Sequence, residues 1–270
     1  MMPANDLSPR QLLDFYLEAG ADAAVGETPV DRFAAPEPAP APRASRPPEG
    51  EIKARAAFAS PPAKPATPQA PEAAAIAARE AAKNAASLDD LRAMLEKFDG
   101  CALKATATQL VFADGNPKAR VMFVGEAPGR DEDIEGLPFV GRSGKLLDRM
   151  LAAIGLDRSS VYIANIVPWR PPGNRTPTPQ ESQICLPFTL RQIELVDPDI
   201  LVCLGGPSAQ TLLGIKEGIT KTRGRWFTFN SGKREIRAIA TFHPAFLLRS
   251  PLQKRFAWRD MLAIKKALNG

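Results

Sequence analysis

Four apolar runs that each end in a loop rich in glycine or polar residues constrain the fold of this 270-residue chain more than any other feature. They are residues 119–129 (ARVMFVGEAPG), 161–169 (VYIANIVPW), 199–206 (DILVCLGG) and 236–244 (IRAIATFHP). Each run has the length and composition of a buried strand, and helical patterns lie between most of them. Alternating strands and helices predict an α/β fold, a three-layer α/β/α sandwich with a central, mostly parallel sheet.

Helical periodicity accounts for much of the sequence between these runs. The expected helices are 143–156, 177–196 with its start near Pro179, 207–214 and 253–268, and one further strand is expected at 225–229. In sheets of this kind, ligands bind at the carboxyl ends of the strands. We therefore expect a site where three loops leave those ends, namely Gly125–Gly129, the segment after Asn165, and His243–Arg249.

The chain divides into three parts. Residues 1–33 form an N-terminal extension in which 7–20 (LSPRQLLDFYLEAG) fits a short amphipathic helix. Residues 34–71 hold eleven prolines among many alanines. They cannot bury enough apolar surface to offset the entropy of ordering, so we expect a disordered linker. Residues 72–270 form the folded unit, led by helical segments over 72–97 in which Ser87 can cap the second.

The net charge of +5 is unevenly distributed. Residues 215–270 contain 13 Lys and Arg against 3 Asp and Glu, which leaves the rest of the chain acidic. A basic third indicates a polyanionic partner such as nucleic acid, and the alternative is a solvated basic surface. No apolar run is long enough to cross a membrane and no basic-then-apolar signal opens the chain, so we expect neither membrane association nor secretion.

The three cysteines, Cys101, Cys185 and Cys203, form no even and closely spaced framework. That pattern fits a reducing cytoplasm better than secretion. The one histidine and the scattered carboxylates form no convincing ligand set, so we expect no metal at a catalytic site.

Three polar residues occupy the predicted strand ends. Glu126 follows an apolar strand, and a carboxylate there can orient water or stabilise a developing cation. The amide of Asn165 can both donate and accept, which suits the edge of a heterocycle. His243, the only histidine, ends a strand just before Pro244. Each residue also has a structural alternative: a helix cap for Glu126, a tie to neighbouring backbone for Asn165 and a packed imidazole for His243.

The segment HPAFLLR (243–249), followed by Lys254 and Arg255, joins apolar side chains to basic ones. Apolar wedges beside positive charge are what a protein needs to unstack a base and hold the surrounding phosphates. The alternative is the start of an amphipathic helix with an ordinary basic face. Phe139 in LPFVGRSG can stack on a flat base, although core packing is the commoner role of a phenylalanine.

Taken together, these segments resemble a known family. GEAPGRDEDIEGLPFVGRSGKLLDRML (125–151), YIANIVPWRPPGNRTPTPQE (162–181) and TFHPAFLLR (241–249) resemble uracil-DNA glycosylases of family 4 in order and spacing. The resemblance covers roughly Cys101 to the C-terminus. It implies an enzyme of base excision repair that flips uracil out of DNA and hydrolyses the bond between uracil N1 and the sugar C1′, leaving an abasic site.

The resemblance also implies roles for individual residues. Glu126 would assist water attack or stabilise the sugar cation, and His243 would stabilise the negative charge on the leaving base. Phe139 would stack on uracil and Asn165 would read its O4 and N3 edge, with Gly125 and Ala127 completing the uracil site. The DNA-binding candidates are Arg142, Ser143, Ser208, Leu247, Arg249 and Lys254, with Leu247 and Arg249 in the loop that enters the groove.

One departure from the family concerns its cofactor. Family 4 enzymes usually carry a [4Fe–4S] cluster on four cysteines, and the corresponding positions here hold Phe98, Cys101, Trp169 and Cys185. Two thiolates cannot hold such a cluster alone. We therefore expect no iron–sulfur cluster, with Phe98 and Trp169 filling its volume and both cysteines remaining reduced thiols.

Three alternatives stay open. The domain could bind uracil or abasic sites without turnover, although Glu126 argues against a pure binder. Its preference could extend to hypoxanthine or xanthine, although Asn165 favours uracil. Residues 7–20 could dock a protein partner through the linker, alongside catalysis. With uracil-containing DNA as the main partner, we expect a monomer in a bacterial-type cytoplasm, associated with the nucleoid.

Overall fold

The structure of the chain is a computed structural model that describes residues 71–269. The helix expected at 7–20 and the linker expected at 34–71, apart from Pro71, lie outside the described residues. Within residues 71–269, no helix combines the length and the apolar character that crossing a bilayer requires.

A six-stranded mixed sheet forms the centre of the described region, in the order β1-β3-β2-β4-β6-β5. The strands are β1 (Asp114–Gly115), β2 (Val121–Gly125), β3 (Tyr162–Asn165), β4 (Ile200–Leu204), β5 (Trp226–Asn230) and β6 (Glu235–Thr241). The inner strands β3, β2, β4 and β6 run parallel, and each edge strand is antiparallel to its neighbour. The expected central, mostly parallel sheet is confirmed.

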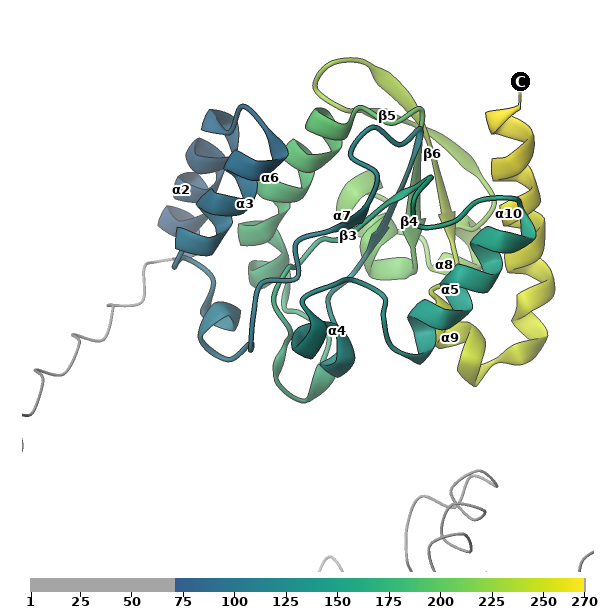
Figure 1. The fold of residues 1–270 in the computed structure, drawn as a ribbon, viewed down its shortest axis with the longest axis horizontal. Coiled ribbons are helices and arrows are strands. Elements are labelled where there is room, and N and C mark those ends of the chain that lie inside the picture. Colours follow the sequence, from purple (N-terminus) through teal and green to yellow (C-terminus); the bar gives the residue numbers. More distant parts are fainter. Residues whose placement is uncertain (1–70, 270) are drawn as a thin grey trace, which may run out of the picture. The chain divides into compact units, whose positions relative to one another are not determined.

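Helices cover both faces of this sheet (Figure 1). They are α2 (Pro71–Asn84), α3 (Leu88–Lys97), α4 (Arg130–Glu135), α5 (Arg142–Ala153), α6 (Pro179–Val196), α7 (Gly206–Leu213), α8 (Ile219–Thr222), α9 (Pro244–Arg249) and α10 (Lys254–Leu268). Helices α2, α3 and α6 lie on one side of the sheet, and α5 and α10 lie on the other (Figure 1). The three-layer sandwich expected from the sequence is therefore confirmed.

Strand β2 shows why the inner strands are continuous apolar runs. Because side chains alternate across a sheet, Met122 and Val124 pack on the α6 side, whereas Val121 and Phe123 pack on the α5 side. All four side chains are buried. A strand covered by helices on both faces has no solvated face, so the polar residues of such a strand are confined to its ends.

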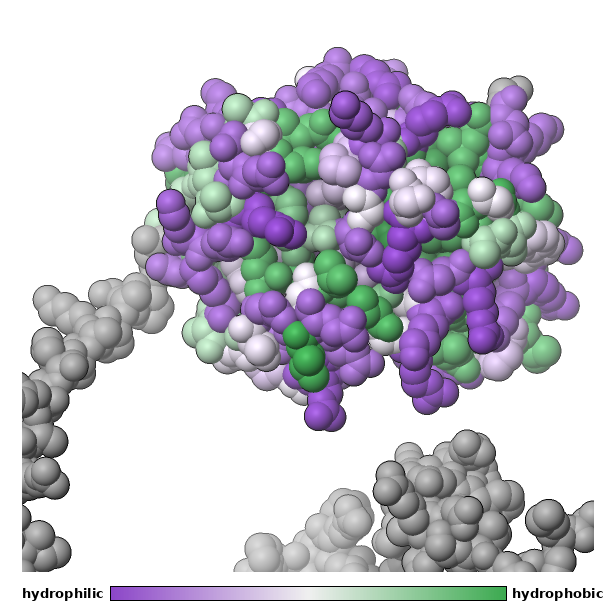
Figure 2. Space-filling view, viewed as in Figure 1, coloured by the Kyte–Doolittle hydropathy of each residue, from purple (hydrophilic) through white to green (hydrophobic). Residues whose placement is uncertain are grey.

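The two leading helices extend the core beyond the sheet. The Ser87 hydroxyl caps α3 by accepting a hydrogen bond from the Asp90 backbone N–H at 3.1 Å, as the sequence predicts. Helix α2 buries Ala74, Ala78 and Ala82, spaced four residues apart, and these small side chains let it pack closely on α6. On the face shown in Figure 2, the surface is mainly hydrophilic and apolar side chains form small separate groups.

Some elements differ from the sequence expectation. Strand β3 ends at Asn165 rather than at residue 169, because its partner β2 ends directly opposite, at Gly125. Residues 243–249 begin a helix with His243 as its N-cap, so the helical alternative for HPAFLLR is the one observed. Helix α4 has no counterpart among the expected elements, because its six residues are too few to establish a periodicity.

Candidate active site

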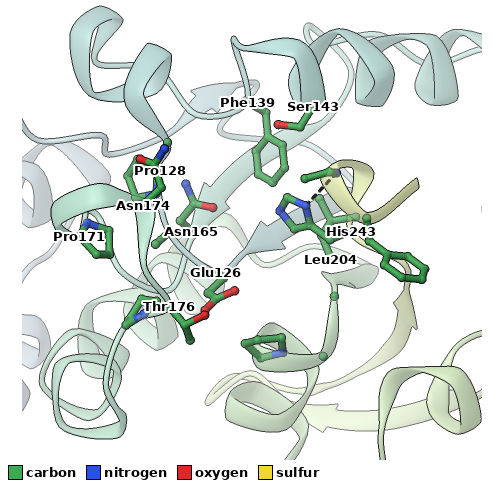
Figure 3. A pocket seen from close by; sticks show the side chains of 18 of the residues that line it. Glu126, Pro128, Phe139, Ser143, Asn165, Pro171, Asn174, Thr176, Leu204 and His243 are labelled. Atoms are coloured by element: carbon green, nitrogen blue, oxygen red, sulfur yellow. Dashed lines mark hydrogen bonds between the residues drawn. The ribbon is translucent and has the colours of Figure 1, made fainter. Parts of the chain in front are cut away.

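The parallel strands bring their carboxyl ends to one edge of the sheet. Gly125 at the end of β2 lies opposite Asn165 at the end of β3, and the ends of β4 and β6 pair beside them. A pocket of about 600 Å³ opens at this edge. Glu126, Phe139, Asn165 and His243 all line it and face a common space (Figure 3). The structure thus brings together the four residues that the sequence singled out for the chemistry and the stacking of a base.

Two enclosed polar atoms of the pocket have no partner. Glu126 Oε1 and Asn165 Oδ1 accept no hydrogen bond from any described residue. Burial raises the pKa of Glu126 above its ordinary value, and the neighbouring Thr176 hydroxyl opposes part of that rise. Buried acceptors without partners cost free energy, and native structures contain few of them. Their position in a cavity indicates that a bound polar molecule satisfies them.

The imidazole of His243 has a defined protonation state. Its Nδ1 accepts a hydrogen bond from the Ala245 backbone N–H at 3.1 Å, which Figure 3 shows as a dashed line. Burial, together with the positive charge of Arg249, lowers the pKa of His243 to about 4. The ring is therefore neutral near pH 7 and carries its single proton on Nε2. An uncharged N–H donor remains on the side away from Ala245.

The ring of Phe139 is held by an unusual backbone conformation. Phe139 has φ of 56°, in the left-handed region that L-residues other than glycine rarely adopt. Gly144, in the first turn of α5, packs directly against the Phe139 carbonyl group, where the Cβ of any other residue would collide. A strained residue at a pocket wall persists only where the surroundings determine it, so Gly144 is part of what places the ring.

Arg158 is a second support for this backbone, and no sequence motif marks it. Its guanidinium donates to the Pro138 carbonyl at 3.1 Å and also to the Phe139 carbonyl. Ion pairs with Asp114 at 2.6 Å and with Asp148 at 2.8 Å hold the guanidinium in place. The planar fork of an arginine can make these contacts at once, which a lysine cannot.

Glu132 joins the loop after β2 to the loop before α5. This buried carboxylate accepts hydrogen bonds from the backbone N–H groups of Gly129 at 3.0 Å, Val140 at 3.1 Å and Gly141 at 3.0 Å. The first of these loops carries Glu126 and the second carries Phe139, so one side chain fixes two pocket walls. This role of Glu132 was not predicted from the sequence, although a glutamate three residues after a helix N-cap is the signature of a capping box.

Helix α6 supports the strand that carries Asn165. The hydroxyl of Thr189, buried in the middle of α6, donates to the Ile166 carbonyl at 3.0 Å. Because Ile166 follows Asn165 directly, this bond fixes the backbone beside the amide. Thr189 was also missed, since its partner lies 23 residues away in the sequence.

Four of the six DNA-binding candidates lie at the surface around or beyond the pocket. Ser143 and Arg249 line the pocket, and together with Arg142 they also line an adjoining hollow of about 450 Å³. Lys254 is exposed at the first residue of α10. Positively charged and hydroxyl side chains in these places are accessible to a phosphate backbone.

The structure contradicts the surface positions expected for Ser208 and Leu247. Ser208 is fully buried in α7, and its hydroxyl donates to the Val124 carbonyl at 2.7 Å. Leu247 is 1% exposed and packs with Phe242 and Ala257. In this conformation neither side chain can reach a phosphate or a groove, because α7 and α9 turn these positions toward the core.

The positions that correspond to the cluster ligands of family 4 form part of one buried apolar group. Trp169 is 2% exposed, and Phe98 packs edge-to-face on Phe188 with ring centroids 5.1 Å apart. Cys101 and Cys185 lie beside each other with their Sγ atoms 3.8 Å apart. Two aromatic rings and two thiols do not fit a group that needs four thiolates. Nor does any set of three or more His, Cys, Asp or Glu within residues 71–269 have an arrangement that could hold a metal ion.

The two neighbouring thiols affect each other. The Cys185 thiol donates a hydrogen bond to the Cys101 sulfur, which lowers the pKa of Cys101, whereas the same contact together with burial raises the pKa of Cys185. Cys203 lies in β4, and burial raises its pKa to about 12.

The chain matches a known protein family over the residues that form this fold and pocket. The family model described as the Uracil DNA glycosylase superfamily matches residues 112–262, more than half of the chain. The match includes the inner strands of the sheet and all four residues that face the pocket. The chain therefore belongs to the uracil-DNA glycosylase superfamily.

Individual relatives narrow the assignment to one type within that superfamily. A Type-4 uracil-DNA glycosylase of Archaeoglobus fulgidus is 43% identical over 169 residues, which cover 61% of this chain and 85% of the relative. The Type-4 enzyme of Thermotoga maritima is 45% identical over 157 residues, 58% and 80% of the two chains. That of Saccharolobus solfataricus is 41% identical over 188 residues, 68% and 87%. The family 4 resemblance of the sequence motifs is confirmed.

Proposed function

We propose that this chain is a uracil-DNA glycosylase that flips uracil out of DNA and hydrolyses its N-glycosidic bond, leaving an abasic site. The observation that carries the proposal is the convergence of Glu126, Asn165 and His243 on one pocket that Phe139 also lines. Excision of a flipped base needs a stacking surface, groups that read the base edge and groups that stabilise separating charges. Phe139 supplies the first and Asn165 the second, and the other two side chains supply the third. The similarity to Type-4 uracil-DNA glycosylases supports the same conclusion.

Phe139 and Asn165 bind the flipped base. Stacking on an aromatic ring contributes about 1–3 kcal/mol, which offsets part of the few kcal/mol that flipping costs. The unpartnered Oδ1 of Asn165 accepts the N3–H of uracil, and its amide N–H donates to O4. Cytosine has an acceptor at N3 and an amino donor at C4, so both contacts would be mismatched and cytosine would be rejected.

Glu126 acts on the water and the sugar. In the carboxylate form it accepts a proton from the attacking water and faces the positive charge that develops at C1′. The water oxygen bonds to C1′ as the bond between C1′ and uracil N1 breaks. The electron pair of the broken bond leaves with uracil, which solvent protonates afterwards.

His243 stabilises the leaving uracil. Its neutral Nε2–H donates to the negative charge that develops on the O2 side of the base, and the Ala245 backbone keeps the ring in that tautomer. A donor aimed at a developing anion typically lowers a barrier by about 3–4 kcal/mol. The low pKa of His243 means that this donor does not depend on protonation of the ring near pH 7.

The DNA backbone lies against the basic rim of the pocket. Arg142, Ser143 and Arg249, around the adjoining hollow, contact the phosphates next to the flipped nucleotide, and Lys254 contacts a more distant one. Phosphate contacts of this kind position the duplex without reading its sequence.

The proposal includes an enzyme without an iron–sulfur cluster, in which Phe98 and Trp169 occupy the volume of the missing ligands. The packing of Phe98 on Phe188 and the burial of Trp169 support it. Iron analysis and visible absorption of the purified protein test it. About four irons per chain with cluster absorption would refute the absence of the cluster without touching the glycosylase assignment.

The remaining parts of the proposal rest on sequence alone. We infer a monomeric enzyme of a bacterial-type cytoplasm, with a protein partner bound by residues 7–20. Deletion of residues 1–70 should leave excision from naked DNA unchanged and alter behaviour in cell extract. Equal behaviour of both forms in extract would remove the partner from the proposal.

The deciding experiment is excision from a labelled oligonucleotide that contains one uracil, followed by alkali to cleave abasic sites. We expect Glu126→Gln and His243→Ala to lower the single-turnover rate by about 100-fold or more each. Glu135→Gln, at an exposed residue of α4, serves as the matched control and should retain full activity. A wild-type protein that retains uracil-containing DNA but releases no uracil would instead be a lesion-binding module.

A further inference from the structure

Cys101 and Cys185 form a pair that uracil excision does not use. Their Sγ atoms are 3.8 Å apart, both side chains are buried, and the Cys185 thiol points its proton at the Cys101 sulfur. Apolar side chains surround the pair, and no third ligand-type residue joins them to form a metal site among the described residues. Two thiols in contact and enclosed by apolar side chains are the arrangement from which a disulfide forms.

We propose that Cys101 and Cys185 are a disulfide-forming pair, which under oxidising conditions links the segment before β2 to helix α6. The link takes the place where the four-thiolate cluster of family 4 would sit. It is independent of the excision chemistry, since neither sulfur lines the pocket.

Forming the disulfide requires only a small movement of the two sulfurs, and the segment around Cys101 can make most of it. A disulfide has an S–S distance of about 2.0 Å, so the sulfurs must approach by roughly 1.8 Å. Cys185 is fixed within the long helix α6, whereas Cys101 precedes a short 3₁₀ turn at Ala102–Ala105. Rotation of the Cys101 side chain and a slight shift of this turn can close the distance without disturbing the helix.

The oxidation is a two-electron step with a peroxide as the oxidant. The Cys101 thiol loses its proton to solvent, and the thiolate attacks one oxygen of hydrogen peroxide. The O–O bond breaks to give Cys101 sulfenic acid and a hydroxide, which takes up that proton and becomes water. The Cys185 sulfur then attacks the Cys101 sulfur, forming the S–S bond and releasing a second water. In total the two thiols lose two hydrogens and the peroxide is reduced to two waters. A dithiol reductant reverses the reaction by thiol–disulfide exchange.

Cys203 provides an internal control for this chemistry. It is fully buried in β4, with no other cysteine beside it. The full chain has three cysteines in all, so the number of reactive thiols in the unfolded protein reports the state of the pair directly.

The crosslink should also change stability in a measurable way. It closes a loop that spans 84 positions of the chain. Closing a long loop restricts the unfolded chain, and we expect oxidation to raise the Tm by about 5–15 °C. Cys203→Ala should show the same rise, whereas Cys101→Ala should show none.

The test treats the purified full chain with hydrogen peroxide or with a dithiol, removes the reagent, and then unfolds the protein in an alkylating reagent. We expect three alkylated cysteines after reduction but only one, Cys203, after oxidation, together with a disulfide-linked peptide pair that contains Cys101 and Cys185. Cys203→Ala should then show no alkylated cysteine after oxidation, which keeps the test decisive even if Cys101→Ala fails to fold.

Three alkylated cysteines after oxidation would overturn the proposal. Sulfinic or sulfonic acid on Cys101, in place of the linked peptides, would also overturn it, as would a purified protein with about four irons per chain. Loss of uracil excision in the oxidised protein would not overturn the proposal, because the proposal concerns only the covalent state of the two cysteines.

Discussion

The rings of Phe139 and His243 face each other in the pocket, with centroids 5.4 Å apart and planes 31° from parallel. They come from different parts of the fold, since Phe139 precedes α5 and His243 caps α9. The pocket therefore has an aromatic surface next to its hydrogen-bond donor. A flat base that stacks on the first ring has an edge within reach of the second.

The first prediction concerns Gly125, which lies directly against the side chains of Asn165 and Phe139. A Cβ at Gly125 would lie 2.6 Å from Phe139 Cζ and would also collide with Asn165 Oδ1. Gly125→Ala should therefore displace both side chains and lower kcat/KM for uracil excision by about 100-fold, measured at temperatures where the variant is folded. Gly218→Ala is the matched control, because Gly218 has open space around it. Full activity of Gly125→Ala would mean that uracil does not bind between these groups.

The second prediction concerns the pH dependence of the rate. Burial places the pKa of Glu126 above its ordinary value of 4.5. In the proposed mechanism the reactive form is the carboxylate. Activity is therefore present above this pKa and should fall tenfold per pH unit below it, so the acid limb lies above pH 4.5. His243 gains its proton only around pH 4. In single-turnover profiles, Glu126→Gln should lack the limb. A limb centred near 6.5 that persists in this variant would assign it to His243.

The third prediction concerns the carboxylate that joins the two loops. Glu132→Ala leaves the backbone N–H groups of Gly129, Val140 and Gly141 without their acceptor. We expect the free energy of unfolding to fall by about 2–4 kcal/mol in urea titrations. At temperatures where the variant is folded, its kcat should fall by about tenfold, because both loops that carry pocket residues lose their common anchor. Glu135→Ala, on the exposed side of the same helix, should match the wild type in both measurements.

The fourth prediction separates two adjacent leucines of α9. Leu247 is buried, so Leu247→Ala should destabilise the protein by about 2–5 kcal/mol through the cavity it leaves. Leu248 is 37% exposed and lines the hollow beside Arg249. Leu248→Ala should barely change stability but should raise the KM for duplex DNA. Urea titration measures the stability of each variant, and steady-state kinetics on one oligonucleotide measure its KM. A higher KM for Leu247→Ala together with a loss of stability for Leu248→Ala would restore Leu247 as the residue that enters the groove.

The sheet and the centre of the pocket follow from sequence, because a simple rule places them. Inner strands of a parallel sheet are buried on both faces, and the polar residue at the end of each one must lie at the common edge. Glu126 and Asn165 obey this rule, and His243 follows it two residues beyond β6. Ser208 and Leu247 lie outside this rule, because a residue near a helix start can face either a phosphate or the core. Only the packing of α7 and α9 decides which way each side chain points.

The residues that support the pocket walls could not be predicted from the sequence, and the reason is different. Arg158 and Thr189 act on backbone carbonyls, and every residue has such a carbonyl, so nothing in the sequence marks the partner. Glu132 left a trace in its position after Gly129, but its bonds to the next loop depend on how the chain turns back. The left-handed conformation of Phe139 is similarly invisible, because the residue type argues against it.

Helix α6 contributes one residue to the sulfur pair and another to the support of the pocket. Cys185 and Thr189 are four residues apart, about one turn, and so project from the same face of the helix. The Thr189 hydroxyl donates to the backbone carbonyl directly after Asn165, and the Cys185 sulfur contacts the Cys101 sulfur. Helix α6 therefore fixes both the position of the Cys185 sulfur and the backbone beside the Asn165 amide, so one element positions a sulfur pair and a pocket wall that share no residue.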